Sequence, residues 1–251
     1  MRALLKINDL WGGYAEGVDI LRGISMEVQQ GEAVGIIGLN GSGKSTFGKA
    51  IMNMIPIRRG EILFNGEDIT TLSISQLAHR GISIMQQGGR VFPNLSVWDN
   101  LLLAAQANNS QFSARPKYAC YQWDARILNS QLGEIIPLLR RPKKELQGLM
   151  ADKLSGGQKH QLSLAMTLAT NPRLIILDEP SAGLSPKAVE EMYQTLLDIR
   201  TKISATIILI EQNIAKAVEF CDRNVMIQQG IIKFILSNDN YKEIELIMFN
   251  K

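Results

Sequence analysis

The chain has 251 residues, 45% of them apolar, and this length and apolar content predict one large domain or two small ones with a packed core. Its formal net charge of +3 at pH 7 is small and no block of like charges occurs, which disfavours a nucleic-acid-binding surface. Apolar runs such as Leu101–Ala105 are far too short to span a bilayer, and Lys6 and Asp9 interrupt the apolar core that an export signal would need.

The first third of the chain is rich in strand patterns. Short apolar or alternating runs predict strands or strand-and-turn segments at Leu4–Asn8, Gly23–Val28, Glu32–Ile37, Gly60–Ile69 and Ile82–Met85. A helix is predicted over Ser45–Ile55, where Pro56 ends it.

The pattern changes from Pro93 to about Met150, where it becomes helical and more polar and predicts an inserted helical subdomain with a loop at Asn108–Pro116. Strands return at Leu174–Leu177 and Thr206–Ile210. The stretch between them has apolar helical spacing and predicts a helix whose core face carries Val189, Met192, Tyr193, Leu196, Arg200 and Ile203. Strand, helix and strand in this order predict a largely parallel sheet.

The strongest local motif is Gly38–Ser45, which reads Gly-Leu-Asn-Gly-Ser-Gly-Lys-Ser and fits G-x-x-x-x-G-K-[ST]. Its glycines allow successive backbone N–H groups to face a phosphate chain, and the following helix directs its positive end to the same place. Lys44 is predicted to reach the β- and γ-phosphates, and the Ser45 hydroxyl to bind Mg²⁺. The apolar strand before the loop and the helix after it argue against an ordinary glycine turn.

A second motif is the apolar strand Leu174–Leu177 followed by Asp178 and Glu179. Alternation along a strand points adjacent side chains in different directions. We therefore predict that Asp178 binds the metal and that Glu179 polarises the attacking water. The alternative is a solvated strand end, which the phosphate loop upstream disfavours.

The third motif is Leu154–Gln158, which reads Leu-Ser-Gly-Gly-Gln and precedes a helix with apolar periodicity that Asn171 and Pro172 close. Ser-Gly-Gly before a helix predicts an N-cap with exposed N–H groups, and hence a second anion site. A helix cap without any ligand is the simpler alternative.

The order of these three motifs closely resembles that of ABC ATPases, over nearly the whole chain. The resemblance implies an α/β fold: a P-loop NTPase (RecA-like) core with a mostly parallel sheet, an N-terminal antiparallel β portion and an inserted α-helical subdomain. It implies one ABC ATPase domain, with a catalytic core at residues 1–92 and 153–236, the helical subdomain at 93–152 and a C-terminal tail at 237–251.

The resemblance also assigns expected roles to single residues. Tyr14 matches the aromatic residue that stacks on adenine, with Trp11 as a nearby competitor and a packing role as the alternative. Gln87 matches the glutamine that senses the metal and the γ-phosphate, unless it is only a solvated loop residue. The residues expected to bind ATP are Tyr14, Gly38, Leu39, Asn40, Gly41, Ser42, Gly43, Lys44, Ser45, Thr46, Ser155, Gly156, Gly157 and Gln158. Those expected to hold Mg²⁺ are Ser45, Gln87 and Asp178.

Two positions depart from the general ABC pattern. Gln212 stands where a switch histidine is usual, and glutamine can donate a hydrogen bond to a γ-phosphate but cannot carry a proton. Ser185 stands where the D-loop usually has aspartate. Both acids of the second motif are present, so we predict hydrolysis, with Glu179, Gln87 and Gln212 as the catalytic residues.

A narrower resemblance is to the second ATP-binding subunit of branched-chain or hydrophobic amino acid importers. It depends on four stretches: Gly88–Phe92, Ile136–Arg141, Pro180–Pro186 and Glu211–Asn213. That subgroup commonly has Glu where Gln87 stands and a bulkier residue before the D-loop glycine, and this chain is longer between Ala105 and Ser130. Urea and amide importers share much of the same pattern and are the alternative.

The resemblance implies partners as well. We expect a second, non-identical ABC ATPase subunit that shares two ATP sites with this chain, two transmembrane permease subunits, and indirectly a solute-binding protein, with no nucleic acid. The chain would be peripheral, at the cytoplasmic face of the plasma (inner) membrane. Val91, Phe92 and Trp98 are candidates for the groove that receives a permease helix, or else for the core.

Two rival classes can be weighed from the sequence. Soluble ABC ATPases of DNA repair and chromosome structure carry a long heptad insertion, and those of translation usually carry two cassettes, whereas this chain has one cassette and a short insertion. A regulatory nucleotide-binding module without turnover is the other rival, and the presence of Glu179 argues against it.

Overall fold

The computed structural model describes residues 3–106 and 132–237, which fall into two compact units. The first unit takes 3–74, 176–179 and 205–237, and the second takes 75–106, 132–175 and 180–204. The predicted loop at Asn108–Pro116 and most of the predicted tail lie outside the described residues. The domain boundaries expected from the sequence stay a prediction.

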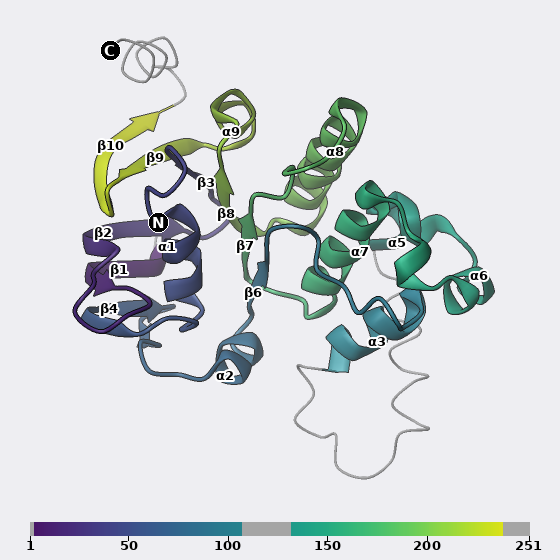
Figure 1. The fold of residues 1–251 in the computed structure, drawn as a ribbon, viewed down its shortest axis with the longest axis horizontal. Helices are drawn as coiled ribbons and strands as arrows, with labels where there is room; N and C mark the ends of the chain where they lie inside the picture. The colour runs from purple at the N-terminus through teal and green to yellow at the C-terminus, as the bar shows by residue number, and fades with distance from the viewer. Residues whose placement is uncertain (1–2, 107–131, 238–251) are drawn as a thin grey trace. The chain divides into compact units, whose positions relative to one another are not determined.

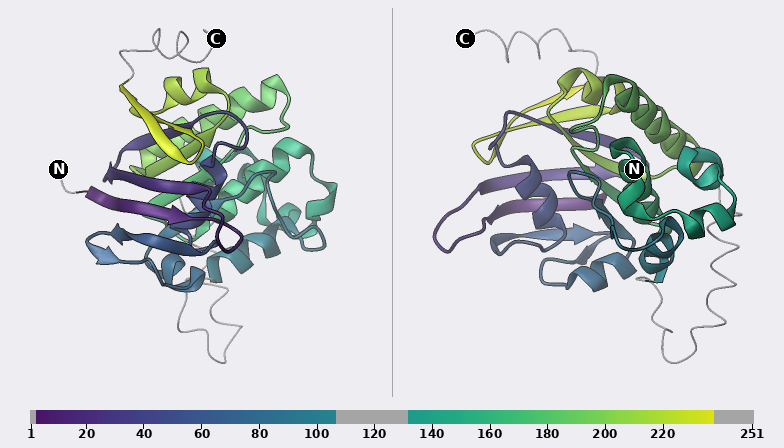
Figure 2. Two further views of the ribbon diagram at one scale, coloured as in Figure 1. Left: turned by 60° about the vertical axis from the view of Figure 1, so that its left-hand side comes forward. Right: turned by 45° about the vertical axis from the view of Figure 1, so that its right-hand side comes forward.

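The first unit begins with an antiparallel sheet whose strand order is β2-β1-β4-β5. Its strands are β1 (Ala3–Gly12), β2 (Leu21–Gln29), β4 (Ile57–Phe64) and the short β5 (Glu67–Asp68). Figures 1 and 2 show β1, β2 and β4 side by side. Buried and exposed residues alternate along much of β2, as expected for a sheet with one face in the core.

The larger sheet of the first unit has the strand order β10-β9-β3-β8-β7. It contains β3 (Ala33–Ile37), the end of β7 (Leu174–Asp178), β8 (Thr206–Glu211), β9 (Arg223–Gln228) and β10 (Ile231–Ser237). β3 pairs in parallel with β8 and β9, and β10 is antiparallel to β9. Every residue of β3 and β8 is buried, which is why both strands are apolar almost throughout.

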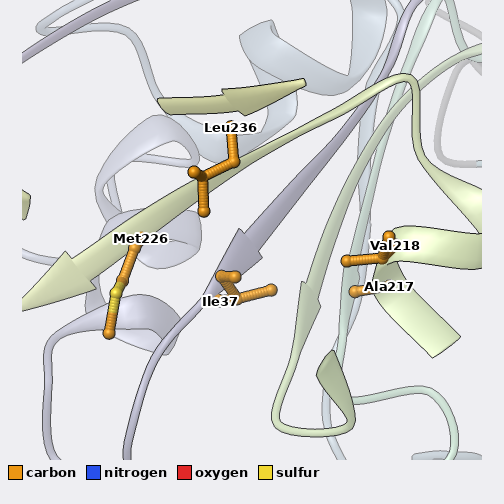
Figure 3. Packing of buried hydrophobic residues seen from close by; sticks show 5 residues of the cluster. All are labelled: Ile37, Ala217, Val218, Met226 and Leu236. Carbon is orange, nitrogen blue, oxygen red and sulfur yellow. The ribbon is translucent and has the colours of Figure 1, made fainter. Parts of the chain in front are cut away.

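Helix α9 (Ile214–Phe220) covers one face of this sheet, and the helix α1 (Lys44–Ile51) follows β3. Figure 3 shows Ile37 of β3 between Met226 and Leu236 of the neighbouring strands on one side and Ala217 and Val218 of α9 on the other. Ile37 is the last residue before the phosphate loop, so this packing fixes the point from which the loop departs. The sequence analysis did not predict β9, β10 or α9.

The end predicted for the first helix is wrong. α1 ends at Ile51, four residues before the predicted end at Ile55. Asn53 adopts a left-handed backbone with φ 51°, which asparagine tolerates better than most residues. Its side-chain amide donates to the carbonyl oxygens of Ile69 at 2.7 Å and Leu72 at 2.8 Å, so contacts distant in sequence end the helix before the proline does.

The second unit is mostly helical, as the sequence predicts. Its elements are α2 (Ile74–His79), β6 (Ile82–Met85), α3 (Val97–Gln106), α5 (Leu132–Ile135), the 3-10 turns η1 (Pro137–Arg140) and η2 (Ala151–Lys153), α6 (Lys143–Gly148), α7 (Gly156–Ala169) and α8 (Pro186–Ile203). On α8 Met192, Tyr193 and Leu196 are buried as predicted, together with Thr195 and Ile199. The prediction is wrong for Val189, Arg200 and Ile203, which are only partly buried.

The sequence left open whether Trp98 lines a groove or belongs to the core, and the structure answers this question. Trp98 of α3 is 3% exposed and the Lys143 ammonium lies 4.6 Å from its ring centroid, so Trp98 belongs to the core. Phe92 is 50% exposed. The buried Asn100 holds this stretch by accepting from the Phe92 N–H at 2.8 Å and donating to the Ser96 carbonyl at 2.9 Å.

Candidate functional site

The phosphate loop of the first unit runs from the end of β3 into α1 with three glycines at positive φ: Gly38 at 149°, Gly41 at 75° and Gly43 at 106°. A Cβ at Gly38 would lie 2.2 Å from the carbonyl oxygen of Ile227, so no other residue fits there without a shift of the backbone. Gly43 is the N-cap of α1 in a left-handed conformation that favours glycine.

Lys44 is buried within this loop, with 4% of its surface exposed. Its ammonium donates to the carbonyl oxygens of Gly38 at 2.8 Å and Leu39 at 3.0 Å. Burial lowers the pKa of Lys44, while the nearby carboxylates of Glu179, Asp178 and Glu211 act in the opposite direction. The lysine therefore braces the loop from inside and lies among three acidic groups.

Asp178, at the end of β7, contacts the first turn of α1. Its Oδ1 accepts a hydrogen bond from the Ser45 hydroxyl at 2.9 Å. Burial raises the pKa of Asp178, and the Ser45 hydrogen bond opposes that shift. A hydroxyl beside a desolvated carboxylate is a pair of hard oxygen ligands, which fits a Mg²⁺ ion that completes its shell with phosphate oxygens and water.

Glu179 is 6% exposed and has a left-handed backbone with φ 49°, although it is not glycine. Its N–H donates to the Ile210 carbonyl at 2.9 Å, and its Oε1 accepts from the Gln212 side-chain amide at 2.5 Å. The carboxylate lines a pocket of about 220 Å³ together with Asn40, Lys44, Ser45 and neighbouring loop residues. A strained backbone held by surrounding bonds is typical of functional positions.

Asp178 and Glu179 therefore contact different elements, the former α1 and the latter the segment after β8. This agrees with the expectation that adjacent side chains at the end of a strand point in different directions.

Tyr14 presents an aromatic ring at the surface of the first unit, with 54% of the residue exposed. Its hydroxyl accepts hydrogen bonds from Lys49 at 3.2 Å and Thr46 at 3.5 Å, both on α1. The competing Trp11 is only partly exposed, and its indole N–H donates to Asp9 at 2.7 Å. Tyr14 thus lies against α1, which follows the phosphate loop, and its expected role toward adenine stays a prediction.

The Ser-Gly-Gly-Gln segment lies in the second unit and caps α7 with a complete capping box. Ser155 Oγ accepts from the Gln158 N–H at 3.3 Å, and Gln158 Oε1 accepts from the Ser155 N–H at 3.0 Å. A pocket of about 580 Å³ is lined by residues 155–158 and by Gly183, Leu184 and Ser185 of the D-loop. Ser185 itself caps α8, accepting from the Ala188 N–H at 3.4 Å.

Gln87 is exposed in the turn after β6, next to Gly88 and Gly89, which both have positive φ. It belongs to the second unit, while the phosphate loop belongs to the first. Its expected roles toward the metal and the γ-phosphate stay predictions.

Three residues of the first unit escaped the sequence analysis. Glu211 is 2% exposed and accepts from the N–H groups of Gln212 and Asn213, so it shapes the turn that presents Gln212. Lys49 holds the Tyr14 hydroxyl. Arg58 contacts the loop that contains Tyr14. Only Glu211 had a signal in the sequence, because it directly follows an apolar strand.

Replacing Asp178 by Asn should raise the melting temperature of the empty protein at pH 7 by about 2–4 °C. The pKa of Asp178 is higher in the folded than in the unfolded chain, so ionisation opposes folding once the pH exceeds the ordinary Asp value. Asn keeps the acceptor for Ser45 and removes this penalty. Thermal melts from pH 7 down to pH 5 measure the effect, which should shrink as the pH falls.

Asp68→Asn is the matched control, because hydrogen bonds from Thr70 lower the pKa of Asp68. This substitution should not raise the melting temperature. A lower melting temperature for Asp178→Asn would mean that its ionised form stabilises the fold.

Within residues 3–106 and 132–237, no helix combines the length and apolarity that a membrane crossing requires.

Comparison with known proteins gives matches over most of the chain. The model of the family described as ABC transporter matches residues 21–182. The probable branched-chain amino acid transport ATP-binding protein LivF of Archaeoglobus fulgidus is 31% identical over 92% of this chain and 91% of its own. The lipopolysaccharide export system ATP-binding protein LptB of Escherichia coli (strain K12) is 29% identical over 91% of this chain and 88% of its own.

A solved ATP-binding cassette of an ABC transporter, in its ADP conformation, has a TM-score of 0.80 to this chain at 24% identity and covers 100% of both chains. The fold of this chain is therefore similar to that of the solved cassette.

Proposed function

The chain belongs to the ABC transporter family as an ATPase subunit, and from that premise we propose that its transporter imports branched-chain or other hydrophobic or neutral amino acids. The single observation that carries the ATPase chemistry is the buried Glu179, held by Gln212 at the pocket of the phosphate loop. The solute class is supported by the likeness to LivF and by the motifs around the D-loop and Glu211–Asn213.

The first step is the capture of ATP in the first unit. The backbone N–H groups of Asn40 and Gly41, two exposed residues, would receive the phosphates. The Lys44 ammonium would exchange its bonds to the Gly38 and Leu39 carbonyls for bonds to phosphate oxygens. The burial that lowers the pKa of Lys44 is offset by the charge of the phosphates, so binding favours the charged form. The Tyr14 ring would stack on the adenine.

Ser45 and Asp178 are the residues that would hold Mg²⁺, with Gln87 as a proposed further ligand. The ion would neutralise charge that develops on the β- and γ-phosphates. The positive charge of the ion would also relieve the cost of burying the Asp178 carboxylate.

Glu179 would orient and deprotonate the attacking water. Its carboxylate lines the pocket beside Lys44 and Ser45, and the Gln212 amide donates to one of its oxygens at 2.5 Å, which fixes the carboxylate at the place where the water would attack. Gln212 would replace the usual switch histidine by donating its amide hydrogens either to Glu179 or to the γ-phosphate.

The capped pocket of the second unit would close over the nucleotide of another subunit. The start of α7 offers backbone N–H groups and the positive end of a helix, while the Gln158 side chain is used within the capping box. We infer a heterodimer of two ATPases that share two ATP sites and whose closure moves two permease subunits. A solute-binding protein would deliver the amino acid, the chain would work at the cytoplasmic face of the membrane, and nucleic acid would take no part.

The test is ATP turnover by the assembled transporter in proteoliposomes, with the second ATPase, both permeases and the solute-binding protein. Binding protein loaded with leucine should raise phosphate release several-fold over unloaded protein. Stimulation by urea- or amide-loaded protein instead would support the alternative importer class. Turnover that is stimulated by a lipid substrate without any binding protein would contradict import. Such a result would agree instead with the likeness to LptB.

A further inference from the structure

The loop at residues 13–20 joins β1 to β2 and carries Tyr14 near its start. It is closed by a hydrogen bond from the Ile20 N–H to the Gly12 carbonyl at 2.9 Å, and it turns through a bond from the Val18 N–H to the Ala15 carbonyl at 3.1 Å. Gly17 has φ 76° within that turn. Most of the loop is exposed, so packing alone does not hold it.

One side chain of β4 contacts this loop at three points. The Arg58 guanidinium donates to the Val18 carbonyl at 3.0 Å and to the Ala15 carbonyl, and it forms an ion pair with Asp19. The Arg58 side chain is 25% exposed, so it lies partly beneath the loop. Because guanidinium donors form a rigid planar fork, these contacts define one arrangement of the loop.

Tyr14 is placed by contacts at its two ends. Its hydroxyl is held by Lys49 and Thr46 of α1, and its backbone is bonded directly to Ala15, whose carbonyl Arg58 holds. Tyr14 is 54% exposed, and the Lys49 ammonium lies 5.4 Å from its ring centroid. Without Arg58, the loop loses its contacts at Ala15, Val18 and Asp19, so the backbone that carries the ring is held less tightly.

We propose that Arg58 is the positioning residue of the adenine site: it holds the loop that presents Tyr14, so that the ring is in place before ATP binds. This inference rests on the proposed stacking of Tyr14 on the base. Preorganisation strengthens binding because less conformational freedom is lost when the ligand arrives. The affected affinity is that for the base, because the Arg58 contacts with Ala15, Val18 and Asp19 all lie in the loop of Tyr14.

The neighbouring Arg59 is a matched control on the same strand. It pairs with Asp9 at 2.7 Å and lies 6.0 Å from the Trp11 ring centroid, so these contacts are with β1 and not with the loop of Tyr14. Its removal takes away an equal charge and a comparable surface contact without touching residues 13–20.

The experiment compares the affinity of the full chain for Mg·ATP and for Mg·tripolyphosphate, which has the phosphates but no base. Arg58→Ala should weaken ATP binding about 5- to 10-fold and leave tripolyphosphate binding within about twofold. Tyr14→Ala should weaken ATP binding about 10-fold or more, and this is the largest loss of affinity that Arg58→Ala can cause. The double variant should be no weaker than Tyr14→Ala alone, because both changes remove the same stacking contact. Arg59→Ala should change neither affinity.

The stacking role of Tyr14 and the positioning role of Arg58 can fail separately, and the measurements distinguish the two failures. If Tyr14→Ala leaves ATP affinity unchanged, the stacking role of Tyr14 is wrong. If Tyr14→Ala weakens ATP but Arg58→Ala does not, or if Arg58→Ala weakens tripolyphosphate equally, the positioning role of Arg58 is wrong. Arg58→Lys, which keeps the charge but loses the fork, should give an intermediate loss and serves as the readout should Arg58→Ala fold poorly.

Discussion

Replacing Glu179 by Gln should lower the rate of ATP hydrolysis in the assembled transporter by about 10²–10⁴-fold while ATP still binds. Gln has the same shape and keeps an acceptor for the Gln212 amide, so the pocket and the backbone at φ 49° need not change. What is lost is the negative charge that takes the proton from the attacking water. Phosphate release and single-turnover assays measure the effect.

The same variant should accumulate an ATP-bound closed dimer, because closure precedes hydrolysis and reopening follows it. Size-exclusion chromatography with ATP and the partner ATPase would detect this species. Glu219→Gln is the matched control, since Glu219 lies on α9 with a 70% exposed side chain that pairs with Lys216 at 3.1 Å. Normal turnover by Glu179→Gln would place the base elsewhere.

Replacing Lys44 by Ala should weaken ATP binding by at least about 100-fold, because charge-assisted bonds to phosphate are among the stronger polar contacts. The ammonium also braces the loop through the Gly38 and Leu39 carbonyls, so its loss removes both the charge and the support of the phosphate site. Fluorescent-nucleotide titration or calorimetry measures the affinity.

The stability of this variant provides an independent check. Burial lowers the pKa of Lys44, which means that the folded protein without nucleotide disfavours the charged ammonium. Lys44→Ala should therefore lower the melting temperature of the empty protein by no more than a few degrees. Lys6→Ala is the control for removal of a lysine, since Lys6 lies in an exposed pair with Glu27. Unchanged ATP affinity in Lys44→Ala would refute the phosphate-binding role.

The parts of the site that the sequence predicts are those built from local geometry. The glycines of the phosphate loop, the acids at the end of β7 and the Ser155 cap all depend on residues within a few positions of each other. Their spacing dictates backbone conformation directly, so each could be predicted with its chemistry. The mostly parallel arrangement of the larger sheet follows from the same kind of pattern, because β3 and β8 are apolar throughout.

The errors and omissions share a different cause. α1 ends early because the Asn53 amide reaches Ile69 and Leu72, and the choice between groove and core for Trp98, which the sequence left open, is decided by its burial beneath the Lys143 ammonium. Neither contact is visible in a local window of sequence. β9 and β10 escaped notice because their assignment depends on pairing with each other and with β3.

The sequence by itself therefore determined the phosphate chemistry, the acidic pair and the family resemblance, because these depend on short runs of residues whose backbone geometry is local. Only the tertiary structure decided that Gln212 holds Glu179, that Ser45 and Asp178 meet, and that Arg58 braces the loop of Tyr14. In the sequence, Gln212 and Glu179 are 33 positions apart, Ser45 and Asp178 are 133 apart, and Arg58 and Val18 are 40 apart. Such distant groups meet only when strands far apart in the chain pair and pack, and no local pattern encodes which side chains will then face each other.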